Sequence, residues 1–369
     1  MAFVEVIMQQ FENSNSTSWM QTARVGFVVS RITRTLTHVQ RASYAETGLA
    51  ESLTITLQPP MPKAIPENPT HEILVGPAGW SYADWAGIVY PAKKPRGFHE
   101  ATYLAEFFDT IEINTSFYQP LRPNLAEQWL DRVSANPRFV FTAKLWQKFT
   151  HEFGVTPEDE RAVRAGFDPL ARAGKLGAVL MQFPFSFHNT PENLAHLKNL
   201  FARFADYPLV IEVRHSTWND KDFFAMLHAR KIGFCNIDQP VIGRSLKPTE
   251  RSTSQIGYIR LHGRRYDTWF SDDPLVPPSE RYNYLYKEDE LEPWAKRIRH
   301  VAKHSGQTFV VTNNHFQGKG IVNALQLINL LTGKKVKVPE PLRHHYPQLE
   351  IIADEPQREP TLFPEPIPE

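Results

Sequence analysis

The sequence predicts an α/β protein of the (β/α)8 (TIM) barrel class. Eight short apolar segments recur between residues 73 and 314, and stretches with helical spacing separate several of them. Strands that are apolar on both faces are typical of a parallel sheet covered by helices on both sides. A stretch from 73 to 335 also has the length of such a barrel, which is typically about 250 residues.

The competing fold is a doubly wound open sheet. Such a sheet usually carries a Gly-rich dinucleotide-binding turn after its first strand, and GPAGWSYADW (76–85) does not match that turn. We therefore prefer the barrel. Its strands are expected, in chain order, at ILVGPAG (73–79), TIEINTS (110–116), RFVFTAKL (138–145), AVLMQFP (178–184), PLVIEVR (208–214), IGFCNID (232–238), IGYIRLHG (256–263) and QTFVVTNN (307–314).

Three helices have clear signals in the sequence. NLAEQWLDRV (124–133) begins with Asn124 and has Glu127 three residues later, which is the spacing of a capping box. The second helix is predicted after Thr190 as N-cap, with Pro191 at its first position. GIVNALQLINLL (320–331) is predicted to be the last helix of the barrel.

Composition narrows the class of protein. The 369 residues carry a formal net charge of +1, so no overall field attracts nucleic acid or an anionic membrane. One cysteine, Cys235, excludes an internal disulfide and a thiolate zinc cluster, and we interpret it as a small core residue. No apolar run is long enough for a membrane helix, and the N-terminus lacks the pattern of a secretion signal. We expect a cytoplasmic protein.

The chain divides into three parts. Residues 1–70 show no sustained periodicity and end in a Pro-rich linker; several arginines there resemble a transit peptide, but we favour translation starting at Met61. Residues 71–338 form the barrel. Residues 339–369 contain eight prolines, which predicts a mobile tail. The PTLF sequence at 360–363 could dock a partner protein, although chance explains it more simply.

Polar side chains gather at the C-terminal ends of the predicted strands. Residues two apart on a strand point to the same side, as Glu212 and Arg214 do. In a barrel that side is the interior, and the C-terminal mouth is where such folds bind ligands. The residues expected to meet there are Glu112, Asn114, Lys144, Gln182, Glu212, Arg214, Arg260, His262 and Asn314.

A structural alternative is a closed ion-pair network that only fills the barrel. Removing an ion from water costs several kcal/mol, and apolar replacements are often as stable, so we favour a ligand site. Three cations, Lys144, Arg214 and Arg260, oppose two glutamates, which predicts an anionic ligand and no cofactor. A divalent metal is the weaker alternative, with ligands drawn from Glu112, Glu212, Asp238, His262 and His315.

Further candidates follow from position and residue type. Gly263 and Arg264 after the seventh strand, and Gly318, Lys319 and Gly320 after the eighth, match the usual place of a phosphate site. Histidines after three strands, or one of the two glutamates, could transfer protons. These histidines are His151, His215 and His262. Aromatic side chains could form stacking walls, and those we select are Trp80, Tyr118 and Trp218.

Seven blocks of the sequence, in order, resemble one known family. They are GPAGWSYADWAGIVYP, FFDTIEINTSFYQPL, FVFTAKLWQKFTH, MQFPFSF, VIEVRHSTW, YIRLHGRR and VVTNNHFQGKGIVNALQL, and they resemble the DUF72 (YecE-like) family over residues 73–335. The resemblance implies a TIM barrel and supplies no established reaction. One departure is Tyr286 followed by Lys287, where the family resemblance predicts Tyr followed by Ser.

Four functions remain open at this point. The first is an enzyme acting on an anionic, phosphorylated or sugar-like small molecule, as a hydrolase, isomerase or lyase. The second is a nucleic-acid-binding barrel that cuts phosphodiesters with the help of metal. The third is a non-catalytic metabolite-binding protein. A glycosidase is the fourth, because two carboxylates at the correct separation would suffice.

Overall fold

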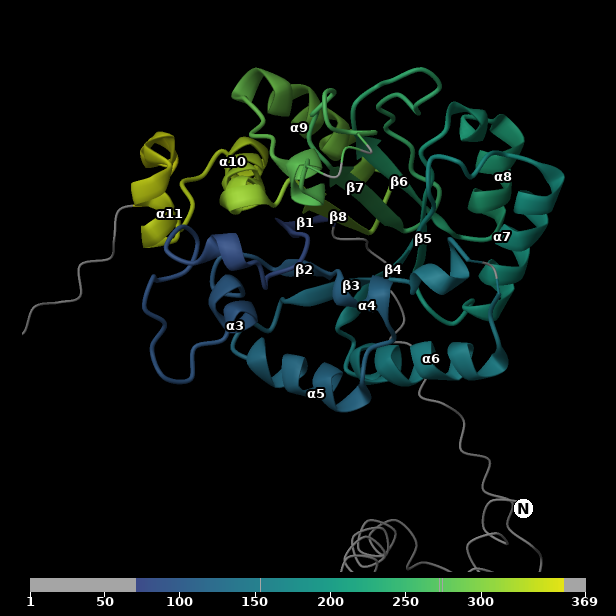
Figure 1. Cartoon of the computed structure of the whole chain (residues 1–369), viewed down its shortest axis with the longest axis horizontal. Coiled ribbons are helices and arrows are strands. Elements are labelled where there is room, and N and C mark those ends of the chain that lie inside the picture. Colours follow the sequence, from purple (N-terminus) through teal and green to yellow (C-terminus); the bar gives the residue numbers. More distant parts are fainter. Residues whose placement is uncertain (1–70, 153, 272, 274, 355–369) are drawn as a thin grey trace, which may run out of the picture. The chain divides into compact units, whose positions relative to one another are not determined.

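The computed structural model describes residues 71–152, 154–271, 273 and 275–354. Its eight strands match the predicted segments, although β1 begins one residue and β4 two residues earlier than predicted, and they form a nearly closed parallel barrel in the order β1-β8-β7-β6-β5-β4-β3-β2 (Figure 1). The predicted fold class is therefore confirmed. The strands are β1 (Glu72–Pro77), β2 (Thr110–Ile113), β3 (Val140–Lys144), β4 (Leu176–Gln182), β5 (Leu209–Glu212), β6 (Gly233–Asp238), β7 (Ile256–Leu261) and β8 (Gln307–Thr312).

The barrel closes between its first and second strands. A full parallel ladder joins β1 to β8, whereas β1 meets β2 through an isolated bridge between Ala78 and Glu112. Next to this bridge, the Gly79 N–H donates to the Glu112 carbonyl oxygen at 2.8 Å. Gly76 allows this close approach, because a Cβ at that position would lie 1.9 Å from the Thr110 carbonyl oxygen.

Helices surround the sheet and follow the strands (Figure 1). One connection differs: between β6 and β7 the described residues 239–255 contain no helix. The loop 239–255 therefore takes the place of a helix between α8 and α9. The helices are α3 (Glu100–Leu104), α4 (Thr115–Tyr118), α5 (Pro123–Arg132), α6 (Pro157–Arg172), α7 (Pro191–Arg203), α8 (Lys221–Ala229), α9 (Glu288–Ala302), α10 (Lys319–Thr332) and α11 (Glu340–His345).

Helix starts were predicted with mixed success. Thr190 caps α7 and accepts a hydrogen bond from the Asn193 N–H, as expected. The predicted cap at Asn124 is wrong, because α5 begins at Pro123 and Arg122 is its N-cap. Proline fixes a helical φ and needs no N–H partner, so it starts the helix one residue earlier.

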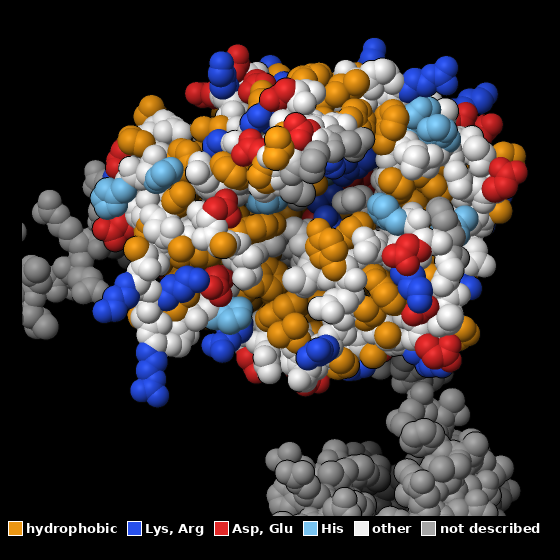
Figure 2. Space-filling model, viewed as in Figure 1, with side chains coloured by type: hydrophobic (Ala, Val, Ile, Leu, Met, Phe, Trp, Pro, Cys, Tyr) orange, Lys and Arg blue, Asp and Glu red, His pale blue; other side chains and the backbone are white. Residues whose placement is uncertain are grey.

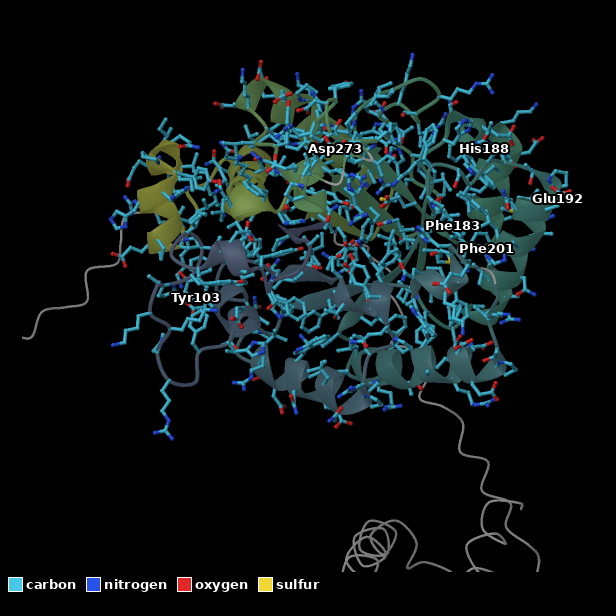
Figure 3. All side chains as sticks on the ribbon, in the orientation of Figure 1. Tyr103, Phe183, His188, Glu192, Phe201 and Asp273 are labelled. Carbon is cyan, nitrogen blue, oxygen red and sulfur yellow. The ribbon has the colours of Figure 1, made fainter. Side chains whose placement is uncertain are left out.

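The core fills both the barrel and the layer between sheet and helices. Phe183, at the end of β4, and Phe201, on α7, are buried between those two elements (Figure 3). Cys235 on β6 is also fully buried, in agreement with its interpretation as a core residue. No helix in the described part of the chain is long and apolar enough to cross a membrane.

The tail predicted from residue 339 is ordered at its start. Helix α11 and the 3-10 turn Pro347–Ile351 bury Leu342 and Leu349 against the barrel. Prolines at the first positions of these turns are compatible with helix. The apolar residues between them pack against the barrel, which the high proline content did not predict. The PTLF sequence and residues 1–70 lie outside the described residues.

Candidate functional site

Arg260 lies at the centre of the candidate site. It extends from β7 into the barrel, is fully buried, and its guanidinium joins two glutamates from other strands. Nη2 donates to Glu112 Oε1 at 2.8 Å, and Nη1 donates to Glu212 Oε2 at 2.6 Å and to Gln182 Oε1 at 3.0 Å. The charges predicted to converge therefore do so, and for these three ionised groups the closed network is the correct description.

Glu212 is held as a carboxylate by its neighbours. Its second oxygen, Oε1, accepts hydrogen bonds from Arg214 Nε and Nη2 at 3.1 and 2.8 Å. Burial opposes ionisation, yet Arg260, His262 and Arg214 outweigh it and hold the pKa of Glu212 well below its usual range. A carboxylate held in this way is a poor proton acceptor near neutral pH.

Lys144, at the end of β3, differs from the sealed groups below it. Its Nζ lies 3.9 Å from Glu112 Oε1 and 5.4 Å from the centre of the Phe117 ring, and 9% of the residue stays exposed. Burial and the nearby Arg260 charge lower the pKa of Lys144 from 10.5 to about 7, despite the opposing effect of Glu112. The side chain therefore keeps a small exposed area, and its amine can exchange a proton near neutrality.

His262 is buried and neutral. The Asn313 amide donates to His262 Nδ1 at 3.0 Å, which places the proton on Nε2, 3.4 Å from Glu212 Oε1. Burial lowers its pKa to about 3. We therefore assign His262 a positioning role toward Glu212 in place of the predicted proton transfer.

The upper layer of the mouth is cationic. The side chain of Arg214 is 15% exposed and lies 5.6 Å from the centre of the Trp269 ring. His151 is half-buried, contacts Phe117 edge to face, and has a pKa lowered by burial and by the charges of Arg214 and Lys144. On the face shown in Figure 2, Lys and Arg side chains lie inside a hollow near the centre of the barrel.

A second polar group lies where β1, β2 and β8 end. Asn114 donates to the Tyr82 hydroxyl at 3.1 Å, and the Tyr82 ring stacks on His315 at 4.3 Å. Asn114 Oδ1 and His315 Nδ1 are buried atoms that have no hydrogen-bond partner among the described residues. Buried polar atoms are usually paired, so these two are available to a ligand or to water.

Other predicted side chains are placed by packing. Trp218 was expected at the rim, but it is fully buried, stacks on Phe187 and donates its indole N–H to the Phe187 carbonyl oxygen. Trp80 is also mostly buried, against Trp129. His215 is buried beside His188, which Figure 3 shows near α7 and α8 at the outer side of the barrel. Trp218 and His215 are therefore structural, contrary to the prediction.

Two further predicted ligand contacts have clear positions. Tyr118 on α4 is 69% exposed, and its carbonyl oxygen accepts the Trp146 indole N–H at 3.1 Å. Asn314 is buried, and its amide donates to the Tyr284 carbonyl oxygen and to Asn323 Oδ1, both at 2.8 Å. Tyr118 can therefore still contact a ligand, whereas Asn314 fastens the loop before α10.

The phosphate cradle expected after β7 and β8 is occupied by internal contacts. The Gly263 N–H donates to the Tyr286 hydroxyl at 2.8 Å, and Arg264 is bidentate to Asp238 at 2.9 and 3.1 Å. Lys319 donates to Asn283 Oδ1, and Gly318 is buried against Val89 and Leu342. The glycines of this region serve close packing, so the predicted phosphate site is wrong.

We expect Gly263→Ala to lower the free energy of unfolding by roughly 1–3 kcal/mol. Gly263 has φ +91°, and a Cβ there would lie 2.7 Å from Tyr284 Cβ. Urea denaturation measures the effect, with Gly97→Ala as control because Gly97 has φ +82° and no atom within 4 Å of its added Cβ. Equal losses in the two variants would show that the Tyr284 contact contributes nothing.

Some site residues were not predicted. The Tyr258 hydroxyl donates to Glu112 Oε2 at 2.8 Å and lies 2.9 Å from Thr142 Oγ1. Tyr258 stands two residues before Arg260, so the alternation of the strand could have revealed it. The described residues contain no group of three His, Cys, Asp or Glu side chains that could hold a metal ion, so the alternative metal cluster is not assembled there.

Comparisons with known proteins agree with this architecture. Residues 74–347 match the family described as Protein of unknown function DUF72. The UPF0759 protein YunF of Bacillus subtilis is 30% identical over 274 residues, which are 70% of this chain and 94% of that protein. The chain is also similar to the crystal structure of a DUF72 family protein from Thermotoga maritima, with a TM-score of 0.62, 30% identity, and coverage of 71% of this chain and 99% of that one.

A more distant structure has the same fold. The crystal structure of a DUF72 family protein from Enterococcus faecalis gives a TM-score of 0.62 at 22% identity and covers 73% of this chain and 98% of that one. The family match spans most of the chain and includes all of β2 to β8 and the charged residues at their ends. The chain therefore belongs to the DUF72 family, a family of proteins of unknown function.

Proposed function

We propose that the chain is an enzyme that acts on an anionic, phosphorylated or sugar-like small molecule at the C-terminal mouth of the barrel. The observation that carries this proposal is the position of Lys144, a largely buried lysine with a pKa of about 7 that borders a sealed ion-pair network and keeps a small exposed area. A buried amine with no close acceptor is costly, which favours a role beyond stability. The proposal includes a cytoplasmic location and no bound cofactor.

Charge balance supports an anionic substrate. With Lys144 protonated, three cations (Lys144, Arg214 and Arg260) face two carboxylates (Glu112 and Glu212), so the group carries one net positive charge. Both Nη atoms of Arg260 already donate to Glu112, Glu212 and Gln182, so the anion would contact Lys144 and Arg214. A phosphate or carboxylate there would stabilise the ammonium form of Lys144.

The same amine can move a proton. A group whose pKa lies near the working pH accepts and returns protons most efficiently. Glu212 and His262 are less suited, because Arg260 holds the first as a carboxylate and burial keeps the second neutral. Asn114 Oδ1 and His315 Nδ1, which lack partners among the described residues, can accept hydrogen bonds from the hydroxyl groups of a sugar-like substrate. Hydrolysis, isomerisation and lyase chemistry all fit these roles.

The alternatives have less support. A glycosidase needs one protonated carboxyl group, whereas Glu112 and Glu212 both accept hydrogen bonds from the same guanidinium. Metal-assisted cutting of nucleic acid needs a ligand cluster that the described residues do not provide. A non-catalytic binding protein would use the same cations, so turnover of a bound compound is what distinguishes it from an enzyme.

We expect pyridoxal 5′-phosphate followed by borohydride to label Lys144 before other lysines. The neutral amine forms an imine with the aldehyde and releases water, and borohydride reduces the imine to a stable secondary amine. Because the reagent carries a phosphate, Arg214 would hold it beside Lys144. Labelling should increase as the pH rises through about 7 and should fall when inorganic phosphate is added. Peptide mass mapping identifies the labelled residue.

Two variants make this test specific. Lys144→Met should lose the early label. Lys148→Met should keep it, because Lys148 lies in the turn after β3 and pairs with Asp159 at the start of α6, at 2.8 Å. Pyridoxal, which lacks the phosphate, should label Lys144 more slowly. Labelling spread evenly over the lysines, or labelling that phosphate does not slow, would contradict the proposed anion site.

A further inference from the structure

A basic groove lies on the side of the barrel, where the helix between β6 and β7 is missing. Two adjoining cavities of about 780 and 720 Å³ follow the loop 239–255 between α8 and α9. They share Glu250, Arg251 and His300, so the two cavities lie next to each other, and together they are called the groove here. None of the mouth residues Lys144, Glu112 or Glu212 lines it.

The groove concentrates positive charge. Five Lys or Arg side chains line the two cavities, and Glu250 is the acidic residue among the lining residues. Glu250 lies 3.6 Å from Arg297, so its charge is already compensated. The whole chain has a net charge of only +1, and the excess of four cations here is therefore local. The cations are Lys231, Arg244, Lys247, Arg251 and Arg297, accompanied by His228, His300 and His304.

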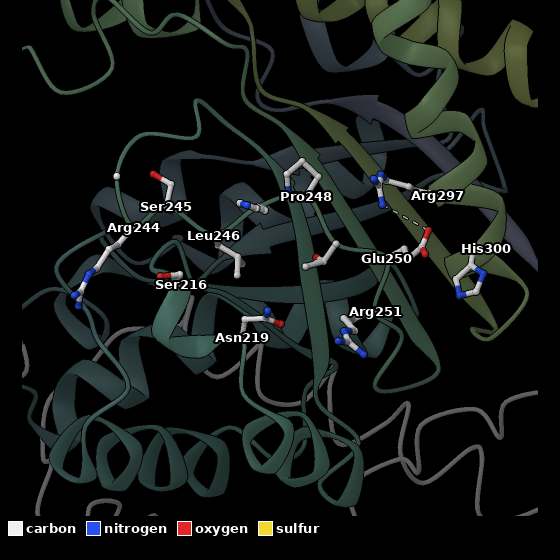
Figure 4. A pocket seen from close by; sticks show the side chains of 13 residues that line it. Ser216, Asn219, Arg244, Ser245, Leu246, Pro248, Glu250, Arg251, Arg297 and His300 are labelled. Atoms are coloured by element: carbon white, nitrogen blue, oxygen red, sulfur yellow. Dashed lines mark ion pairs between the residues drawn. The ribbon is translucent and has the colours of Figure 1, made fainter.

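The cations are spread along the groove. Figure 4 shows Arg244 at one end of the first cavity and Arg251, Arg297 and His300 toward the other. Lys231 and His304 line the adjoining cavity. A single small anion would need only two or three of these groups. Charges distributed over two adjoining depressions are suited to an extended polyanion.

The loop that carries most of these cations is anchored. Asn236, buried on β6, accepts from the Arg251 N–H at 2.7 Å and donates to the Arg251 carbonyl oxygen at 2.9 Å. At the other end, the Leu246 N–H donates to the Arg214 carbonyl oxygen at 2.7 Å, and the Ser216 N–H donates to that of Arg244 at 2.8 Å. The cations are therefore presented by an ordered backbone, which lowers the entropy lost on binding.

The remaining lining residues point to the chemistry of the polyanion. Among the lining residues there is no Phe, Tyr or Trp on which a base could stack, so contact would be made through phosphate groups. Leu246 and Pro248 are the larger apolar residues, and Leu246 is buried. A protein partner normally uses central apolar anchors, which this groove offers poorly.

We propose that this groove binds nucleic acid through its phosphates and without base preference. The strand lies along the wall between α8 and α9, with phosphates at Arg244, Lys247 and Arg251. This binding is separate from the small-molecule chemistry proposed for the mouth and does not depend on it.

The test measures binding of a fluorescein-labelled thymidine oligonucleotide of about 20 residues to the full chain by fluorescence anisotropy, between about 50 and 200 mM salt. The triple variant Arg244→Ala/Lys247→Ala/Arg251→Ala should bind at least about tenfold more weakly at the lower salt. Its slope of log K against log salt should be smaller by about 2, because each phosphate contact on a single strand contributes about 0.7.

A matched control removes the same charge elsewhere. Lys93, Arg96 and Lys198 are exposed and lie outside the groove, so changing all three to Ala should leave affinity and slope nearly unchanged. Lys144→Met should also bind normally, which separates this result from the fate of the mouth. Binding of fluorescein-labelled poly-L-glutamate is measured in the same way. The proposal is overturned by any of three outcomes: the oligonucleotide does not bind at low salt, the two triple variants lose equal affinity for it, or the groove variant loses affinity for poly-L-glutamate and keeps its affinity for the oligonucleotide.

Discussion

Arg260→Met should lower the free energy of unfolding by roughly 3–5 kcal/mol at pH 7, the largest effect we expect from any single change at the site. The guanidinium donates to Glu112, Glu212 and Gln182 inside the barrel. The arginine and the two glutamates are fully buried. Methionine fills a similar volume but leaves two carboxylates without their shared cation. The loss therefore comes from unpaired buried charge and not from a cavity.

The pH dependence of this loss has a definite sign. In the native chain the pKa of Glu212 is held well below 4.5, so the stability that it contributes is present above pH 4.5 and is lost only in acid. Without Arg260, burial raises the pKa of Glu212 in the folded state. The folded variant then binds more protons than the unfolded chain between about pH 4.5 and 7, and its deficit should shrink as the pH falls from 7 to 5.

Urea denaturation at pH 7 and pH 5 measures both effects. Arg138→Met is the control, because Arg138 is 64% exposed and pairs with Glu72 and Asp109 at 3.2 Å on the surface. That change should cost less than about 1 kcal/mol. If Arg260→Met loses equally little free energy of unfolding, or if its loss grows toward pH 5, the two glutamates do not need this arginine to remain buried as carboxylates.

Lys144→Met should have the opposite effect and stabilise the barrel by roughly 1–4 kcal/mol at pH 6. Folding lowers the pKa of Lys144 from 10.5 to about 7, because burial and the Arg260 charge disfavour the ammonium form. Below pH 7 the folded protein must bear a buried charge that the unfolded chain leaves in water. Methionine keeps the length of the side chain and removes that cost.

The gain should depend on pH in a predictable direction. Between about pH 7 and 10.5 the unfolded chain holds a proton at Lys144 that the folded chain has released, so native stability rises with pH in this window. The advantage of Lys144→Met should therefore shrink between pH 7 and 9 by at most about 1.4 kcal/mol per unit. Thermal unfolding at pH 6 and 9 gives the comparison, with Lys148→Met as the control. A destabilised Lys144→Met would mean that Lys144 is structural and would remove the main support for the proposed enzyme.

The fold was predictable because its signal is repeated. Eight apolar segments at regular intervals leave few architectures, and each segment overlaps a strand of the barrel. The convergence of Glu112, Glu212 and Arg260 was also predictable, because alternation along a strand determines which side a residue faces. That reasoning determines the side of the sheet and not the height in the barrel.

The position of each side chain along the barrel axis could not be predicted from the sequence. Strand tilt and stagger decide that Arg260 is sealed while Lys144 keeps a small exposed area, and no local pattern encodes the register between β3 and β7. Trp218 was misjudged for a related reason, since its burial depends on Phe187 from the preceding connection. Gly263 and Gly318 could equally have served a phosphate or close packing, and the approach of Tyr284 and Val89 decides in favour of packing.

The shared guanidinium at the centre has a consequence for anyone who wishes to redesign this barrel. Arg260, Glu112 and Glu212 come from three strands and satisfy one another, so exchanging one of them alone leaves a mismatched pair in an interior that cannot admit solvent. They have to be replaced as a set. The more adjustable positions lie above these three residues, at Lys144 and His151, whereas Arg214 has to stay because it donates to Glu212.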